Sequence, residues 1–137
     1  MRVVITKESI SGQDPVPAGI YQAKYNNHSL KDSKAGNPTI WLTFVLETQG
    51  ANPEIKTIGK KVVDNITLTE DSLWRANELY NAATGEDLPQ RAFETEEEFT
   101  AFLVAALQNK PLLLDISIGV YKGKPRNSID SFSTPQV

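Results

Sequence analysis

The stretch Leu30–Leu46, LKDSKAGNPTIWLTFVL, joins a turn with two lysines to the clearest strand pattern in the chain. Gly36 and Asn37 tolerate positive φ, and Pro38 fixes its own φ, so a turn is predicted here. Beyond the turn, apolar residues recur at every second position, which is typical of a half-buried strand. The opposite face of this strand carries Trp41. The predicted core face comprises Ile40, Leu42, Phe44 and Leu46.

Lys31 and Lys34 lie in this turn, which leads into the face that carries the indole of Trp41. Cations beside an exposed aromatic ring suit a single-stranded nucleic acid, because the cations neutralise phosphates and the ring stacks on a base. The alternative is a solvated loop followed by a tryptophan that packs against another element. This stretch alone leaves both interpretations open.

Length and composition indicate one intracellular domain. A chain of 137 residues with 39% hydrophobic content can bury its own core, so we expect a single domain over residues 1–137. The absence of cysteine excludes disulfides, zinc ribbons and thiol nucleophiles. The apolar runs are too short for a signal peptide or a membrane helix, so we expect a cytoplasmic protein without membrane contact.

The charges are segregated along the chain. Residues 1–68 hold eight Lys and Arg against six Asp and Glu, and residues 110–137 hold four against two. Residues 69–109 hold two against nine. Because local charge steers ligands, the net charge of −3 does not exclude a basic surface on the predicted β part of the chain.

The hydrophobic periodicity predicts five strands and two helices. The expected strands cover residues 19–30, 38–48, 56–68, 112–121 and 128–132. Two helices are expected over 69–84 and 95–109. Together with their connection they form an acidic insert at residues 69–109. We interpret residues 1–17 as an irregular lead-in or an extra edge strand, and 133–137 as a flexible tail. The first helix is predicted to pack through Leu73, Trp74, Asn77, Tyr80 and Ala83.

This order, three strands, a helical insert and two strands, is that of an OB-fold, a five-stranded antiparallel barrel. In that fold the loops after the first and fourth strands bind oligonucleotides. Here those loops are Lys31–Pro38 and Tyr121–Asn127, and both are basic. A five-stranded antiparallel sheet with two helices on one face has the same order, so the closure of the barrel is left open.

Four segments, in this order, resemble a family of small tailed-phage proteins of long-unassigned function. The segments are VPAGIYQAKY at 16–25, SKAGNP at 33–38, DNITLTEDSLWR at 64–75 and YKGKPRNSIDSF at 121–132. Proteins of that family occur in phage replication and recombination cassettes, and some resemble OB-fold single-stranded-DNA-binding proteins. The resemblance implies a phage protein that coats single-stranded DNA in the cytoplasm of the host cell. The chain ends SFSTPQV, so we expect no acidic tail that recruits partners.

The candidate site residues are cations and aromatic rings. The predicted contacts to the DNA backbone are Lys24, Lys31, Lys34, Lys60, Lys61, Lys122, Lys124 and Arg126. Trp41, Tyr25 and Tyr121 are the predicted stacking residues. His28, the sole histidine, has no metal-binding companion, so we predict no catalytic residue, metal or cofactor.

The leading hypothesis is therefore sequence-independent binding of single-stranded DNA, which protects or organises it in phage replication or recombination. The alternative is an interaction module that binds a host or replisome protein through the acidic insert. An enzyme is not expected. The sequence leaves open a homodimer formed through an exposed edge strand.

Overall fold

The computed structural model describes residues 2–3 and 15–135. Its strands are β1 (Gly19–Asp32), β2 (Pro38–Leu46), β3 (Lys61–Thr67), β4 (Pro111–Tyr121) and β5 (Lys124–Ser133). Between β3 and β4 the chain forms a short 3-10 helix η1 (Glu70–Ser72) and the helices α2 (Leu73–Thr84) and α3 (Glu96–Leu107). The prediction of a mainly β chain with five antiparallel strands and two helices is confirmed. The expectation of an irregular lead-in or extra edge strand at residues 1–17 falls mostly on residues outside the described ranges.

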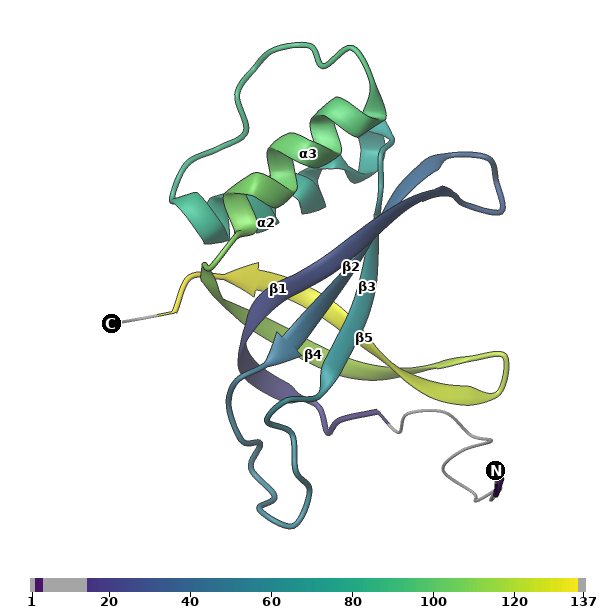
Figure 1. The fold of residues 1–137 in the computed structure, drawn as a ribbon, viewed down its shortest axis with the longest axis vertical. Coiled ribbons are helices and arrows are strands. Elements are labelled where there is room, and N and C mark those ends of the chain that lie inside the picture. The colour runs from purple at the N-terminus through teal and green to yellow at the C-terminus, as the bar shows by residue number, and fades with distance from the viewer. Residues whose placement is uncertain (1, 4–14, 136–137) are drawn as a thin grey trace.

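The strands form one antiparallel sheet in the order β3-β2-β1-β4-β5. β1 is long enough to pair with two neighbours: Gly19–Lys24 pairs with β4, and Ala23–Asp32 pairs with β2. A register shift between Tyr25 and Asn27 bends β1 between these two parts. The sheet coils strongly, and the helices lie together at one end of it (Figure 1). No helix in the described ranges is long and apolar enough to cross a membrane.

The core lies inside the coiled sheet and beneath the helices. The predicted alternation of β2 is confirmed, since Ile40, Leu42 and Phe44 are each no more than 1% exposed. Helices α2 and α3 close this core through Leu79 and Leu103, both fully buried. Burying apolar side chains from all five strands and both helices in one cluster is the main force that holds this arrangement together.

Side chains join β3 to β5, the two strands that end the ladder. The carboxylate of Asp64 on β3 accepts a hydrogen bond from the backbone N–H of Ile129 on β5 at 2.7 Å. Arg75 on α2 donates to the carbonyl of Ile129 at 2.9 Å and to that of Asn65 at 3.1 Å. The side chains of Asp64 and Arg75 thus form the hydrogen bonds to backbone groups of β3 and β5 that a further strand would otherwise form. These bonds hold β3 and β5 side by side.

The third strand begins later than predicted. We expected it from Lys56, with Ile58 on the core face, but β3 begins at Lys61 and Ile58 is 49% exposed. The intervening residues form a turn in which Lys60 N–H donates to the carbonyl of Thr57 at 3.0 Å and Gly59 has a φ of 86°. Few residues other than glycine adopt such a φ, so the strand cannot extend back through this position.

The predicted packing face of the first helix was wrong in part: Tyr80 and Ala83 pack against the core, whereas Leu73 and Trp74 do not. Trp74 is 59% exposed, and the buried residues of α2 are Ala76, Leu79 and Ala82. The α-helix begins at Leu73, after η1, so its first turn projects past the core. Trp74 is therefore a surface residue.

Candidate nucleic-acid interface

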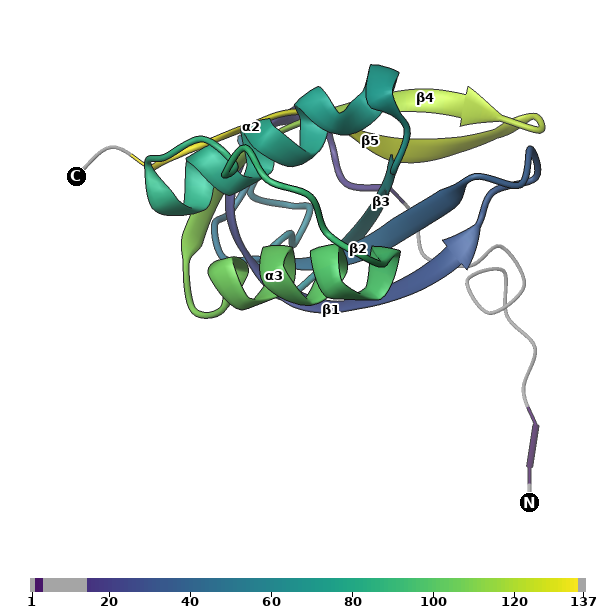
Figure 2. The same ribbon diagram turned by 90° about the horizontal axis from the view of Figure 1, so that it is seen from above.

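Two basic hairpin tips project from the same side of the molecule (Figures 1 and 2). In the tip between β1 and β2, the N–H of Ser33 donates to the carbonyl of Asn37 at 2.7 Å and Gly36 has a φ of 85°. This turn carries Lys34. The tip between β4 and β5 carries Lys122.

The second tip is shorter than the predicted loop at Tyr121–Asn127. It is a two-residue turn, Lys122-Gly123, with φ of 51° and 76°, and β5 begins at Lys124. Positive φ at both positions is the mark of a type I′ turn, whose twist matches that of the flanking strands and lets the hairpin continue to its end. Ile118 and Val120, which continue the apolar alternation of the strand expected over 112–121, are consequently 45% and 76% exposed on the projecting hairpin.

Tyr121 lies at the centre of a cluster of cations from both tips. The guanidinium carbon of Arg126 is 5.0 Å from the centre of the Tyr121 ring, and the ammonium nitrogen of Lys122 is 5.4 Å from it. The positive charge of Lys122 lowers the pKa of the Tyr121 phenol, and Lys34 lowers this pKa further through a hydrogen bond and its charge. Lys34 belongs to the other hairpin, so its charge acts on Tyr121 across the space between two tips that stand apart on the same side of the molecule (Figure 1).

Trp41 lies on the outer face of the sheet, beside the first tip. It is partly buried between its ladder neighbours Ser29 on β1 and Asn65 on β3. A shallow hollow of about 440 Å³ exposes the indole. The residues that line this hollow all come from β1, β2 and β3, and they are Asn27, His28, Ser29, Lys31, Trp41, Thr43 and Val63. The indole therefore faces away from the helices.

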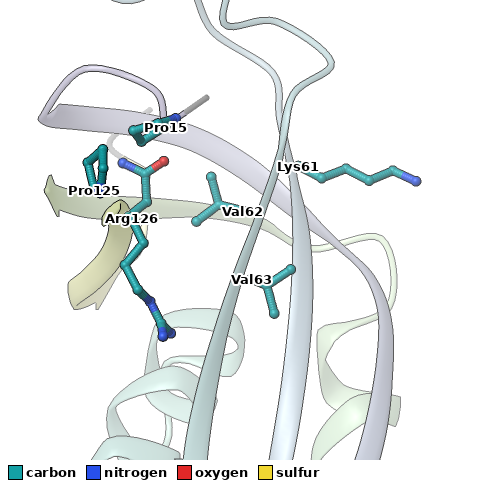
Figure 3. Close-up of a pocket in the computed structure, with 7 residues that line it drawn as sticks. Pro15, Lys61, Val62, Val63, Pro125 and Arg126 are labelled. Atoms are coloured by element: carbon teal, nitrogen blue, oxygen red, sulfur yellow. The ribbon is translucent and has the colours of Figure 1, made fainter. Parts of the chain in front are cut away.

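A second hollow, of about 260 Å³, lies between β3 and β5. Figure 3 shows Val62 pointing toward Pro15 and Pro125, whereas Lys61 points away from them. Val63 lines both hollows, so it connects the Trp41 face to β5. We use the name tip groove for the side chains at the two tips together with those of the two hollows between them that carry a charge, a ring or the shared Val63. Its members are Lys31, Lys34, Trp41, Val63, Tyr121, Lys122 and Arg126.

Three of the predicted cations lie at the end of the sheet away from the turn that contains Lys34. Lys24 and Lys61 both pair with Val45 there, and Lys61 also lines the hollow between β3 and β5 that Arg126 lines. Lys24 also forms an ion pair with Glu47 at 3.6 Å. Lys60 lies in the turn just before β3. By contrast, Lys124 is exposed and pairs with Tyr121 in the β4–β5 hairpin, so it adjoins the tip groove.

Tyr25 lies on the core side of β1. Its ring packs against the core, and its hydroxyl oxygen lies 2.6 Å from Nδ1 of His28. Burial raises the pKa of the Tyr25 phenol. This placement gives no support to the predicted stacking role, so Tyr25 is not part of the tip groove.

The sequence model of one protein family matches residues 4–136, nearly the whole chain. The chain belongs to DUF669. The description of this family is a protein of unknown function, so the prediction of an uncharacterised family is confirmed. Among curated proteins, no sequence matches this DUF669 chain significantly. For this DUF669 chain, phage origin and DNA binding stay predictions.

Proposed function

We propose that this DUF669 chain binds single-stranded DNA without sequence preference, through the tip groove, and that it protects or organises that DNA in phage replication or recombination. The observation that carries the proposal is the cluster at Tyr121. It brings cations from two hairpins, distant in sequence, around one ring that is 48% exposed. Such a combination of charge and aromatic surface suits an unpaired strand.

The fold supports an OB-type barrel. Each pair of neighbouring strands is antiparallel, so β3 and β5 run in the same direction, and they lie side by side. The helices fall between β3 and β4 along the chain. In an OB-type barrel the loops after the first and fourth strands bind oligonucleotides, and here those loops are the two basic tips.

The proposed mechanism combines charge and stacking. Lys31, Lys34, Lys122, Lys124 and Arg126 neutralise the phosphates, with Lys24, Lys60 and Lys61 as outlying contacts to a longer strand. Bases stack on Trp41 and Tyr121. Stacking on a protein ring requires an uncovered base face, which a duplex does not offer, so the tip groove prefers single strands.

A gel shift with labelled oligo-dT, compared with a duplex of equal length over a salt series, tests this function. We expect binding at low micromolar protein or tighter, a preference for the single strand, and weakening as salt rises. Absence of any shift at about 50 mM salt with tens of micromolar protein would contradict the proposal.

The acidic insert favours a second candidate function, the binding of a host or replisome protein. A hollow of about 480 Å³ in the insert is lined by Leu73, Leu88, Phe93 and Phe99, with Glu94 and Glu96 beside them. Trp74 follows Leu73 on the surface. If this function is the correct one, Trp74→Ala weakens capture of the partner and leaves oligo-dT binding unchanged.

A further inference from the structure

The second half of β1 has a free edge. Gly19–Lys24 pairs with β4, but from Tyr25 onward β2 is the one ladder neighbour of β1 among the described residues. At the turn, the N–H of Ser33 donates a hydrogen bond to the carbonyl of Asn37. Pro38 lies opposite Asp32 but does not bond to it, because proline has no N–H and the Pro38 carbonyl accepts from the N–H of Leu68, just after β3.

Hydrogen-bonded and non-bonded pairs alternate along an antiparallel ladder. Ser33 and Asn37 form a bonded pair, so every second residue before Ser33, namely Lys31 and Ser29, also directs its backbone N–H and C=O groups toward β2. His28, Leu30 and Asp32 therefore direct their backbone N–H and C=O groups away from β2. In the part of the chain that the structure describes, these groups have no hydrogen-bond partner.

A groove runs along this edge, between β1 and α3. It consists of two hollows of about 460 Å³ each, which share Leu30 and Glu97. We call it the edge groove. Its lining residues are His28, Leu30, Lys31, Asp32, Pro38, Glu96, Glu97, Thr100, Ala101, Val104, Ala105 and Gln108.

Thr100 provides an independent sign that this groove takes a ligand. Its side chain lines the groove and is 3% exposed, yet its hydroxyl oxygen has no hydrogen-bond partner within residues 2–3 and 15–135. A buried hydroxyl without a partner is costly, and most buried hydroxyls in folded proteins are paired. Because the hydroxyl oxygen is itself shielded from solvent, the Thr100 side chain has to rotate toward the groove to meet a polar group of an occupant.

The charged and apolar residues that line the edge groove indicate which kind of ligand it can bind. Asp32, Glu96 and Glu97 line one end of it against a single cation, Lys31, and the insert as a whole, residues 69–109, holds nine acidic against two basic residues. Val104 and Ala101 make the other end apolar. A ligand with Lys or Arg side chains and small apolar side chains complements both ends.

We propose that the edge groove binds an extended segment of a partner protein as an added strand along His28–Asp32. Every second side chain of this segment faces the groove, and these groove-facing side chains are basic near Glu97 and apolar near Val104. The backbone of the segment pairs with His28, Leu30 and Asp32, and its side chains alternate between the groove and solvent, as in other cases of strand addition. The tip groove lies on the outer face of the sheet, so this proposal does not depend on DNA binding.

The test uses the full chain and a labelled valine–lysine peptide about eight residues long, in which every second residue is lysine in one half and valine in the other, with serine between them. Fluorescence anisotropy measures binding, and amide hydrogen exchange followed by NMR locates it. We expect the peptide to bind, to weaken with salt, and to slow exchange at His28, Leu30 and Asp32. The valine–glutamate counterpart is expected not to bind, because the groove is acidic.

Two variants and a matched control separate the contributions. Thr100→Val keeps the shape and removes the hydroxyl, so peptide affinity should fall about fivefold with no loss of thermal stability. Neutralising Glu96 and Glu97 to glutamine should weaken binding about threefold per residue and reduce its salt dependence. Glu86→Gln, an exposed change beyond the end of α2, should leave binding unchanged.

Three results would overturn the proposal. The first is no binding of the valine–lysine peptide at several hundred micromolar. The second is binding that does not protect the three amides. The third is a dimer in solution whose His28, Leu30 and Asp32 amides are already protected without peptide, because a second copy of the chain would then occupy the edge.

Discussion

Asp64 Oδ2 on β3 lies 2.7 Å from the backbone nitrogen of Ile129 on β5 and accepts its hydrogen bond. Arg75 completes the link, since it donates to the Ile129 carbonyl at 2.9 Å and lies 3.4 Å from the Asp64 carboxylate. These contacts hold β5, and with it the β4–β5 tip, beside β3. The tip groove therefore depends on a junction that lies away from its own residues.

Asp64→Ala should destabilise the fold by about 2 kcal/mol, because it leaves the Ile129 N–H and the Arg75 guanidinium without their partner. The measurement is the free energy of unfolding in urea. Asp115→Ala, which removes an exposed carboxylate on β4, is the matched control and should change stability little. Equal stabilities of the two variants would show that Asp64 does not join the strands.

Trp41→Ala should weaken oligo-dT binding by about 1–3 kcal/mol, the value of one base stacked on an aromatic ring. The chain offers a matched control in Trp74, its second tryptophan, which is 59% exposed on α2 and outside the tip groove. Trp74→Ala should leave the dissociation constant unchanged in a fluorescence titration. The stacking role of Trp41 fails if both variants bind as tightly as the parent chain.

Removing the charges of Lys34 and Lys122 should reduce the slope of log affinity against log salt by about 0.7 per residue. Lys34→Gln and Lys122→Asn are suitable, because asparagine tolerates the φ of 51° at position 122 and preserves the turn. The measurement is oligo-dT affinity over a salt series. A slope identical to that of the parent chain would mean that neither lysine contacts a phosphate.

The Tyr121 phenol should titrate below its ordinary pKa, chiefly because of the charge of Lys122. DNA phosphates counter the surrounding cations, so binding should raise this pKa. Binding then favours the protonated phenol, and affinity is full below the pKa of the free protein and declines as pH rises through it. Ultraviolet titration with and without oligo-dT measures both pKa values, and Tyr121→Phe should remove this component of the pH dependence.

Local patterns in the sequence predicted a strand or helix correctly where its residues alternate plainly between the core and the solvent. The alternation of β2 is observed, and the helix expected over 95–109 begins at a capping contact in which the hydroxyl of Thr95 accepts from the N–H of Glu98 at 3.0 Å. The sequence also placed Trp41 on the face opposite the core. These features depend on neighbours within a few positions along the chain.

The errors arise where distant residues decide the structure. The link between Asp64 and Ile129 has no signal in the sequence, because the two residues lie 65 positions apart. Trp74 was assigned to the packed face, because the helical period alone does not reveal where the helix begins relative to the core. The cluster at Tyr121 was only partly foreseen, since its connection to Lys34 arises from the coiling of the whole sheet.

The central claim is that the tip groove, and not the acidic insert, binds single-stranded DNA. Its most direct test is a titration with oligo-dT that follows the indole N–H signals of the two tryptophans by NMR, since Trp41 and Trp74 report on these two surfaces separately. We predict that the Trp41 signal shifts and saturates while the Trp74 signal stays in place. A shift of Trp74 alone, or no shift of either signal at saturating oligo-dT, would contradict the claim.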